Sequence, residues 1–403
     1  MFNKRNEPFH LVIIKPSHYD NEGYPIQWVR SIMPANSLAV LYGLASDCAE
    51  RQVLGPEVTI RLTVIDECNT RVRPDRIAAK IRRQGGKALI GLIGVQSNQF
   101  PRALDIARQF RAMDLPVCIG GFHVSGCLSM LSELTPELQE ALDLGCSLFA
   151  GEAEGHLEGL LRDAWAQRLS PIYNHLDSLP GPESEPGPYL PAKFVRRTAG
   201  YLTSFDAGRG CPFQCSFCTI INVQGRKSRF RSANDVERIV RENMDHGIKR
   251  FFITDDNFFR NKNWEAIFDR LIELRASRYS GLQIVIQVDT LCHRTPNFIE
   301  KAKEAGVRYV FIGLESINPE NLANAKKKQN RIVEYREMLQ AWRAAGVITY
   351  AGYILGFPTD TPDRILSEIE IIKRELPVDL LEFFNLTPLP GSEDHRNALA
   401  EGV

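Results

Sequence analysis

The sequence has 403 residues, with 49 basic and 49 acidic side chains, so its formal net charge is zero. This length predicts more than one domain, and the balanced charge argues against a nucleic-acid-binding protein, which usually carries a basic excess. The polar segment 1–8 and short apolar runs such as 88–95 predict no signal peptide and no membrane span. Nine cysteines in such a chain favour reduced thiols and metal ligands over disulfides, and therefore a cytoplasmic protein.

The first half alternates apolar, strand-like runs with helical spacing. The expected strands are 11–14, 58–65, 88–95, 117–119 and 148–150, and the expected helices are 37–49, 77–83 and 101–113. Strands this apolar, separated by helices, are typical of a parallel sheet that is covered on both faces. The pattern predicts an α/β fold, a doubly wound Rossmann-like domain over residues 1–170, with its ligand at the carboxyl ends of the strands.

Proline and glycine crowd the next stretch, which we interpret as a linker over residues 171–195. Strand–helix units then repeat to the end of the chain. The expected strands are 201–206, 250–254, 283–288, 309–314, 349–355 and 381–386, with helices such as 233–246 and 332–345. Six such units predict a partial (β/α) barrel over residues 196–403, with chemistry where strands end.

Three cysteines stand close together after the first strand of this second half. Cys211, Cys215 and Cys218 are spaced CxxxCxxC within one loop. A four-iron cluster needs one outside ligand for each iron, so three thiolates leave one iron open to a reactant. Structural zinc is the alternative, but it needs four N or S ligands and usually takes paired CxxC elements. The nearest further candidates for zinc are His246, Cys292 and His293.

The triplet, with Phe217 directly before its last cysteine, resembles the signature of the radical S-adenosylmethionine (SAM) superfamily. The resemblance implies a [4Fe–4S] cluster that binds SAM and cleaves it to a 5′-deoxyadenosyl radical. It also implies an electron donor such as flavodoxin or ferredoxin. Segments at the next strand ends resemble the family's SAM-contacting elements, and they add as cofactor-binding candidates Asp255, Asp256, Asn257, Gln287, Asp289, Gly313, Glu315, Ser316, Gly352, Ile354 and Gly356. No catalytic acid or base is assigned.

Three arginines follow the cysteine loop: Arg226, Arg229 and Arg231. We expect most of them to form a solvated basic face, with one available to the SAM carboxylate.

The first half resembles the cobalamin-binding domain that is joined to many radical SAM enzymes, over most of residues 10–165. Small and polar residues at strand ends allow backbone to approach a large planar ligand closely. The candidates for binding this cofactor are Asn36, Ser37, Leu38, Asp66, Gln96, Ser97, Gly120, Gly121, His123, Val124, Gly151, Glu152 and Glu154. No Asp-x-His motif occurs, which implies a cobalt without a histidine lower ligand. A domain that keeps the fold without the ligand stays open, and His123 is more simply a capping or hydrogen-bonding residue.

The combined resemblance implies a cobalamin-dependent methyltransferase that acts on an unactivated carbon or a phosphorus atom of a small molecule. A radical cyclase or rearrangement enzyme is one alternative. A radical SAM enzyme without cobalamin, including a methylthiotransferase with a second cluster, is another. Five further cysteines are available for that cluster, but their scatter favours core positions: Cys48, Cys68, Cys118, Cys127 and Cys146. Only twelve residues follow Gly391, so we expect the C-terminal region usual in this family to be either absent from this sequence or contributed by another chain.

Overall fold

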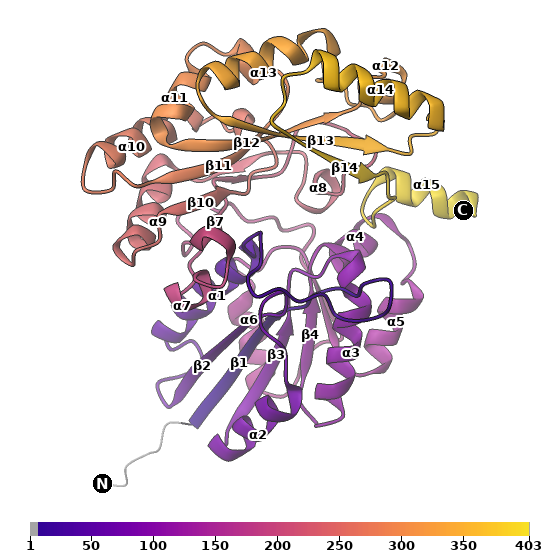
Figure 1. Cartoon of the computed structure of the whole chain (residues 1–403). Helices are drawn as coiled ribbons and strands as arrows, with labels where there is room; N and C mark the ends of the chain where they lie inside the picture. The colour runs from indigo at the N-terminus through magenta and orange to yellow at the C-terminus, as the bar shows by residue number, and fades with distance from the viewer. Residues whose placement is uncertain (1–6, 403) are drawn as a thin grey trace.

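The computed structural model describes residues 7–402, and it contains two six-stranded parallel sheets that lie one above the other in Figure 1. Most of the segment 1–8, on which the signal-peptide expectation rests, lies outside these residues. Every helix within residues 7–402 is too short or too polar to cross a membrane.

The first sheet confirms the expected doubly wound fold. Its strand order is β2-β1-β3-β4-β5-β6, and all pairs are parallel. The order reverses at β1, and the carboxyl ends of the strands at such a switch point are where this fold places ligands. The strands are β1 (Glu7–Lys15), β2 (Val58–Asp66), β3 (Lys87–Leu92), β4 (Val117–Gly120), β5 (Ser147–Ala150) and β6 (Ile172–Asn174).

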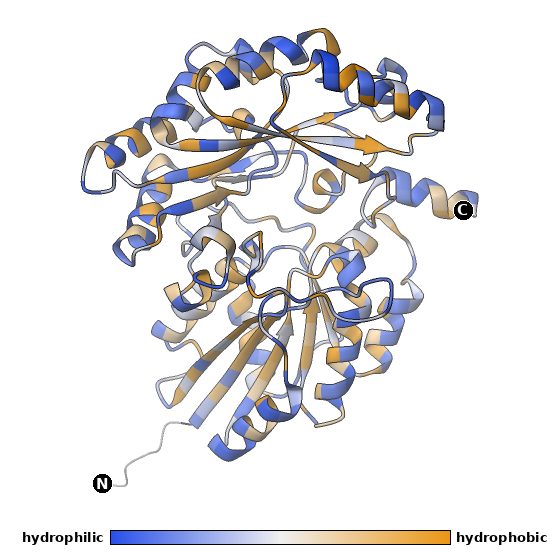
Figure 2. Cartoon of the chain, in the orientation of Figure 1, coloured by the Kyte–Doolittle hydropathy of each residue, from blue (hydrophilic) through white to orange (hydrophobic). Residues whose placement is uncertain are grey.

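Alternate side chains of these strands face different helices. Leu11 and Ile13 belong to the core under α1 and α6, whereas Val12 and Ile14 belong to the core under the other helices. Both faces are therefore buried, which explains why the strands are apolar runs (Figure 2). The helices are α1 (Asn36–Glu50), α2 (Pro74–Gln84), α3 (Phe100–Arg111), α4 (Phe122–Met130), α5 (Pro136–Asp143) and α6 (Leu157–Trp165), with the 3₁₀ turn η1 (Ser97–Gln99).

The second sheet confirms the partial barrel, because its strands pair in chain order from β7 to β14 and these two form its edges. The strands are β7 (Leu202–Phe205), β10 (Arg250–Ile253), β11 (Gln283–Val288), β12 (Val307–Glu315), β13 (Ile348–Leu355) and β14 (Leu380–Asn385). The helices are α9 (Ala233–Asp245), α10 (Trp264–Ala276), α11 (Phe298–Ala305), α12 (Pro319–Asn324), α13 (Tyr335–Ala344), α14 (Pro362–Glu375) and α15 (Glu393–Glu401), with the 3₁₀ turns η3 (Phe258–Arg260), η4 (Cys292–Arg294) and η5 (Ile332–Glu334).

The segment 171–195 is not wholly irregular. Its first residues form β6, which pairs with β5 at the edge of the first sheet, and its last form α7 (Ala192–Val195). The 3₁₀ turn η2 (Ala199–Tyr201) then leads to β7. A strand of three residues is too short to show alternation, and an edge position tolerates nearby prolines. The bounds of the two domains stay a prediction.

The two halves share one core around α1, which packs against β1, β2 and β7. Gly43 of α1 lies directly against the segment before β7, since a Cβ there would stand 2.3 Å from the Gly187 carbonyl oxygen. This close contact holds the carboxyl end of the first sheet near the start of the second.

Candidate functional site

A cavity of about 560 Å³ lies where the two halves meet. The ends of β4 and β5 line it from one side, and Thr254 and Asp256 line it from the other, directly after β10. The residues predicted from sequence that line this cavity are Asn36, Ser37, Gln96, Gly120, Gly121, Gly151, Glu152, Glu154 and Asp256. Candidates from both predicted domains thus meet in one space.

The floor of the cavity runs down one face of the first sheet. Side chains from the middle of four strands line it: Leu11, Ile13, Leu89, Gly91, Cys118 and Phe149. Glycine inside a strand often marks a place where another group approaches the backbone, and a Cβ on Gly91 would meet nothing closer than 3.5 Å. A large, partly apolar group fits between this face and helices α1 and α6. Among the described residues that line the cavity there is no histidine.

Five predicted residues of the first half do not line this cavity, because their side chains are engaged elsewhere. Leu38 and Val124 are buried in the two cores. Asp66 accepts a hydrogen bond from the Cys68 backbone N–H at 3.0 Å. Ser97 and His123 lie 3.2 Å apart, from hydroxyl to ring Nδ1. His123 stands in the first turn of α4, which begins directly after the Gly-Gly pair.

The glutamates after β5 are paired with arginines of the other half. Arg209 donates to Glu152 at 2.9 Å and to Glu154 at 2.6 Å, and all three side chains are at most 8% exposed. Arg229 bonds both oxygens of Glu152, and the wholly buried Arg231 lies 3.4 Å from Asp206. The expectation of a solvated basic face is therefore wrong for Arg229 and Arg231. Arg209 and Arg229 clamp the two halves together, because buried carboxylates need such partners.

The cysteine loop connects β8 (Gly208–Arg209) to α8 (Ile220–Val223), and β8 pairs with β9 (Arg229–Phe230). Cys215 is buried, while Cys211 and Cys218 are half-buried. Burial raises the pKa of Cys211 and raises that of Cys218 to about 12. Among the described residues 7–402, the sulfur atoms of these three cysteines do not all lie within 4.8 Å of one another. The sulfur atoms around a single tetrahedral zinc ion would lie closer together, about 3.8 Å apart, because each Zn–S bond is about 2.3 Å long.

Two polar residues beside the loop were not predicted from the sequence. The Lys327 ammonium lies 2.6 Å from a Glu315 oxygen and 5.6 Å from the centre of the Phe217 ring. The Gln329 amide lies 3.5 Å from the Cys215 sulfur. Although burial opposes it, the Glu315 carboxylate and the nearby thiols raise the pKa of Lys327, so a fixed positive charge borders the cysteines. The only sequence signal was a run of three lysines after the Glu315 segment.

The carboxylates after β10 and β11 differ in their partners. Asp255 accepts backbone hydrogen bonds from Ala207 and Gly208 at 2.7 and 2.8 Å, and burial raises its pKa to about 7. Asp256 lines the cavity with its side chain exposed and with no ion-pair partner among the described residues, and partial loss of hydration beside the surrounding protein raises its pKa to about 6. Asp256 is therefore the carboxylate that is free to receive a cation.

Two of the remaining candidates on these strands hold neighbouring groups in place. Asp289 lies 2.7 Å from Arg260 and accepts from Asn257 at 3.1 Å. The Gln287 amide donates to the Asp255 carbonyl at 3.3 Å. These contacts fix the shape of the turn that presents Asp256.

The candidates on β12 and β13 shape the strand ends beside the cysteine loop. Glu315 has a left-handed φ of 62°, and a Cβ on Gly313 would lie 2.3 Å from its carboxylate. Ser316 is buried and accepts from the Asn318 N–H at 3.0 Å. The others provide close packing or a turn: Gly352 against Phe311, Ile354 against Phe217, and Gly356, whose N–H donates to Asp360 at 2.9 Å.

The sequence model of the radical SAM superfamily matches residues 206–372. Hopanoid C-2 methylase of Rhodopseudomonas palustris is 27% identical over 71% of this chain and 53% of its own length. Bacteriochlorophyllide d C-8(2)-methyltransferase of Chlorobaculum tepidum is 28% identical over 80% of this chain and 71% of its own. This chain thus spans about half to seven tenths of these two relatives.

The fold is that of TsrM of Kitasatospora setae, a radical SAM methyltransferase solved with cobalamin and a [4Fe–4S] cluster. Its structure matches with a TM-score of 0.72 at 15% identity, over 96% of this chain and 74% of TsrM. The cysteine loop and the candidate strand-end residues as far as Gly356 lie within the matched segment 206–372. Residues 206–372 therefore match the radical SAM superfamily, and the chain has the fold of TsrM, including the sheet that precedes this segment.

Proposed function

We propose that this chain is a cobalamin-dependent radical SAM methyltransferase that acts on an unactivated carbon or a phosphorus atom. The observation that supports this most strongly is the single cavity shared by the floor of the first sheet and Asp256 of the second half. Methyl transfer between two cofactors requires that both reach the same acceptor, and one enclosed space supplies that proximity.

Each cofactor has a set of residues that fits it. Cys211, Cys215 and Cys218 would hold the cluster, with Lys327 as a neighbouring positive charge. Asp256 would receive the ammonium group of SAM. The glycine-rich rim and the floor beside Gly91 would hold cobalamin. When bound, these groups supply a 5′-deoxyadenosyl radical and a transferable methyl group, and the protein supplies orientation and a space from which water is excluded.

A methylthiotransferase fits less well. The cysteines of the first half would have to hold a second cluster, but Cys48, Cys118, Cys127 and Cys146 are buried in the cores. Burial raises the pKa of Cys48, Cys118 and Cys146 to about 11 or 12, which favours inert core positions for these three thiols. A radical cyclase or rearrangement enzyme would use the same two cofactors without net methyl transfer, so experiment has to separate it from the methyltransferase.

The acceptor is proposed to be a small molecule with a large apolar surface. The segment between β1 and α1 displays large apolar side chains: Trp28 is 60% exposed, Val29 93%, Ile32 70% and Met33 53%. Met33 also lines the cavity. Exposed apolar groups at the mouth of a site are typical of a surface that receives an apolar ligand. A flavodoxin or ferredoxin as electron donor and a cytoplasmic location are part of the same proposal.

The test follows the two halves of SAM separately. The protein is reconstituted without oxygen, with and without cobalamin, and incubated with a reductant and SAM that carries an isotope label in its methyl group. We expect 5′-deoxyadenosine in both samples, but S-adenosylhomocysteine and labelled cobalamin only when cobalamin is present. 5′-Deoxyadenosine without S-adenosylhomocysteine would support the cyclase. If neither 5′-deoxyadenosine nor S-adenosylhomocysteine is formed, both the methyltransferase and the cyclase assignments are contradicted.

A further inference from the structure

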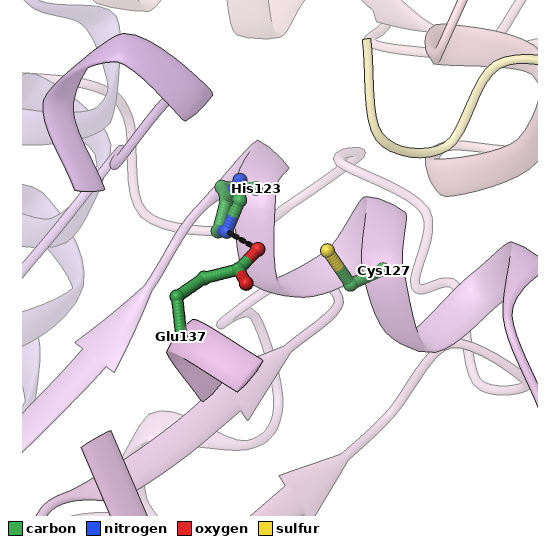
Figure 3. Close-up of side chains that lie close together, drawn as sticks. All are labelled: His123, Cys127 and Glu137. Carbon is green, nitrogen blue, oxygen red and sulfur yellow. Dashed lines mark ion pairs between the residues drawn. The ribbon is translucent and has the colours of Figure 1, made fainter. Parts of the chain in front are cut away.

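Three metal-ligating side chains lie together away from the cavity, on two helices of the first half (Figure 3). His123 and Cys127 are one turn apart on α4, so they share a face of that helix, and Glu137 stands on α5. One ligand atom from each lies within 4.8 Å of the other two. The nine residues that separate Cys127 from Glu137 in the sequence include the turn that brings α5 back against α4.

The imidazole of His123 is oriented towards this cluster. It is 94% buried, its Nδ1 is 3.2 Å from the Ser97 hydroxyl, and its ring centre lies 4.3 Å from that of Phe100. Nε2 therefore points at Glu137, 3.3 Å from a carboxylate oxygen, yet it has no hydrogen-bond partner. Metal-bound histidines commonly have one nitrogen held by an outer partner while the other binds the ion. A buried nitrogen that has an ion-pair contact but no well-aligned hydrogen bond is available for such a role.

We propose that His123 Nε2, Cys127 Sγ and the Glu137 carboxylate form a structural zinc site. One nitrogen, one sulfur and one oxygen are donors that zinc takes in proteins, at about 2.0 to 2.3 Å. His395 on α15 is the candidate for the fourth position. Its Nδ1 is also buried without a partner, and it lies within electrostatic range of both His123 and Glu137.

The position of this site gives it a structural role next to the cysteine loop. A Cβ on Gly126 of α4 would lie 2.2 Å from the Pro390 carbonyl oxygen, so α4 is pressed against the segment that leads to α15. At the start of α15, the Asp394 N–H donates to the carbonyl of Ser216, between two cluster cysteines, at 3.1 Å. A zinc ion held by α4, α5 and α15 would therefore fix the C-terminal helix across the two halves.

A simple ion pair between His123 and Glu137 is the competing explanation. It would account for their 3.3 Å separation, but it gives no role to the Cys127 sulfur or to the unpaired nitrogen of His395. The two explanations differ in one measurable property, which is whether the protein retains zinc through Cys127.

The test is metal analysis of the full chain with its iron–sulfur cluster reconstituted, after exposure to zinc sulfate and removal of excess metal. We expect about one zinc per chain, with X-ray absorption showing one sulfur at about 2.3 Å and the remaining ligands at about 2.0 Å. Cys127→Ala should lose the zinc and keep its iron. Cys146→Ala, which removes another buried thiol of the same domain, should keep both metals.

A second variant probes the outer partner. Ser97→Ala leaves all ligands in place, and it should weaken zinc binding by about 10-fold, as loss of an outer hydrogen bond usually does. His395→Ala should replace one nitrogen ligand by water in the absorption spectrum. Wild-type protein without zinc, or zinc retained equally by Cys127→Ala, would overturn the proposal. Because iron is counted in the same samples, failure of the zinc site is distinguishable from failure of the radical SAM cluster.

Discussion

Acidic residues at the carboxyl ends of strands have different roles in the two halves. After β5, Glu152 and Glu154 are neutralised by Arg209 from the other half. After β10, Asp256 has no such partner among the described residues and faces the cavity. The same residue type at the same place in a parallel sheet thus serves as a clamp in one half and as a candidate ligand in the other. The partner of a carboxylate, rather than its position, separates the two roles.

The halves also differ in what they bring to the cavity. The first contributes shape, through glycines and apolar side chains on the face of its sheet. The second contributes charge through Asp256, which lies within electrostatic range of Cys211 and Cys218 in the cysteine loop. If this division is correct, changes in the first half should affect cobalamin alone, and changes in the second should affect SAM or iron.

Filling the floor should have the largest effect on one cofactor. Gly91→Leu extends a side chain into the cavity, and its Cβ would meet no atom closer than 3.5 Å, so the fold should survive while cobalamin affinity falls by at least about 100-fold, equivalent to about 2.7 kcal/mol. Cobalt content after gel filtration measures this. Gly159→Leu is the control, because Gly159 of α6 has no atom within 4 Å of a Cβ and does not line the cavity. Equal cobalt in both variants would contradict the placement of cobalamin on this floor.

Removing the clamp should mainly lower stability. Arg209→Ala leaves buried Glu152, Glu154 and Asp206 without this partner, and the free energy of unfolding should fall by about 3–5 kcal/mol. Urea denaturation measures the change. Arg51→Ala removes an exposed arginine that also bonds two carboxylates, and it should change stability little. A similar small change in both variants would show that the clamp is not needed to join the halves.

The charge of Asp256 should produce a smaller, pH-dependent effect on SAM. Because the pKa of this side chain is raised to about 6, it is protonated below pH 6 and becomes an anion above it. SAM affinity should therefore rise between pH 5 and pH 7. Asp256→Asn should lower the affinity at pH 7 by about 10-fold, the effect of losing one charged hydrogen bond, and should remove this part of the pH dependence. Equilibrium dialysis checks both, with the exposed Asp269→Asn as the control.

The elements that were predicted well are those whose sequence signal is local. The strands β3 and β11 are apolar runs or strict alternations bounded by polar residues, so their positions follow from burial alone. Strand β6 was missed because its three residues carry no period. Helix α4 was missed because its apolar and small residues lack a polar face, and its Gly-Gly start is equally typical of a strand end.

The candidate site divides in the same way. The cysteine loop was predicted because its ligands lie within eight residues of one another. The arginine clamp was not, since Arg209 and Glu152 are 57 positions apart and meet only when both halves fold. Lys327 was missed for a related reason. The left-handed turn at Glu315 and helix α12 bring it back beside Cys215, and neither effect is visible from spacing.

The most direct test of the two-cofactor site is to count iron and cobalt in one preparation. Protein reconstituted without oxygen and supplied with hydroxocobalamin should contain about four irons and about one cobalt per chain. The Cys211→Ala/Cys215→Ala/Cys218→Ala variant should lose the iron and retain the cobalt, because the floor of the first sheet is untouched. Iron without cobalt in the wild-type protein would contradict the methyltransferase proposal. Zinc in place of iron at the cysteine loop would contradict the cluster itself.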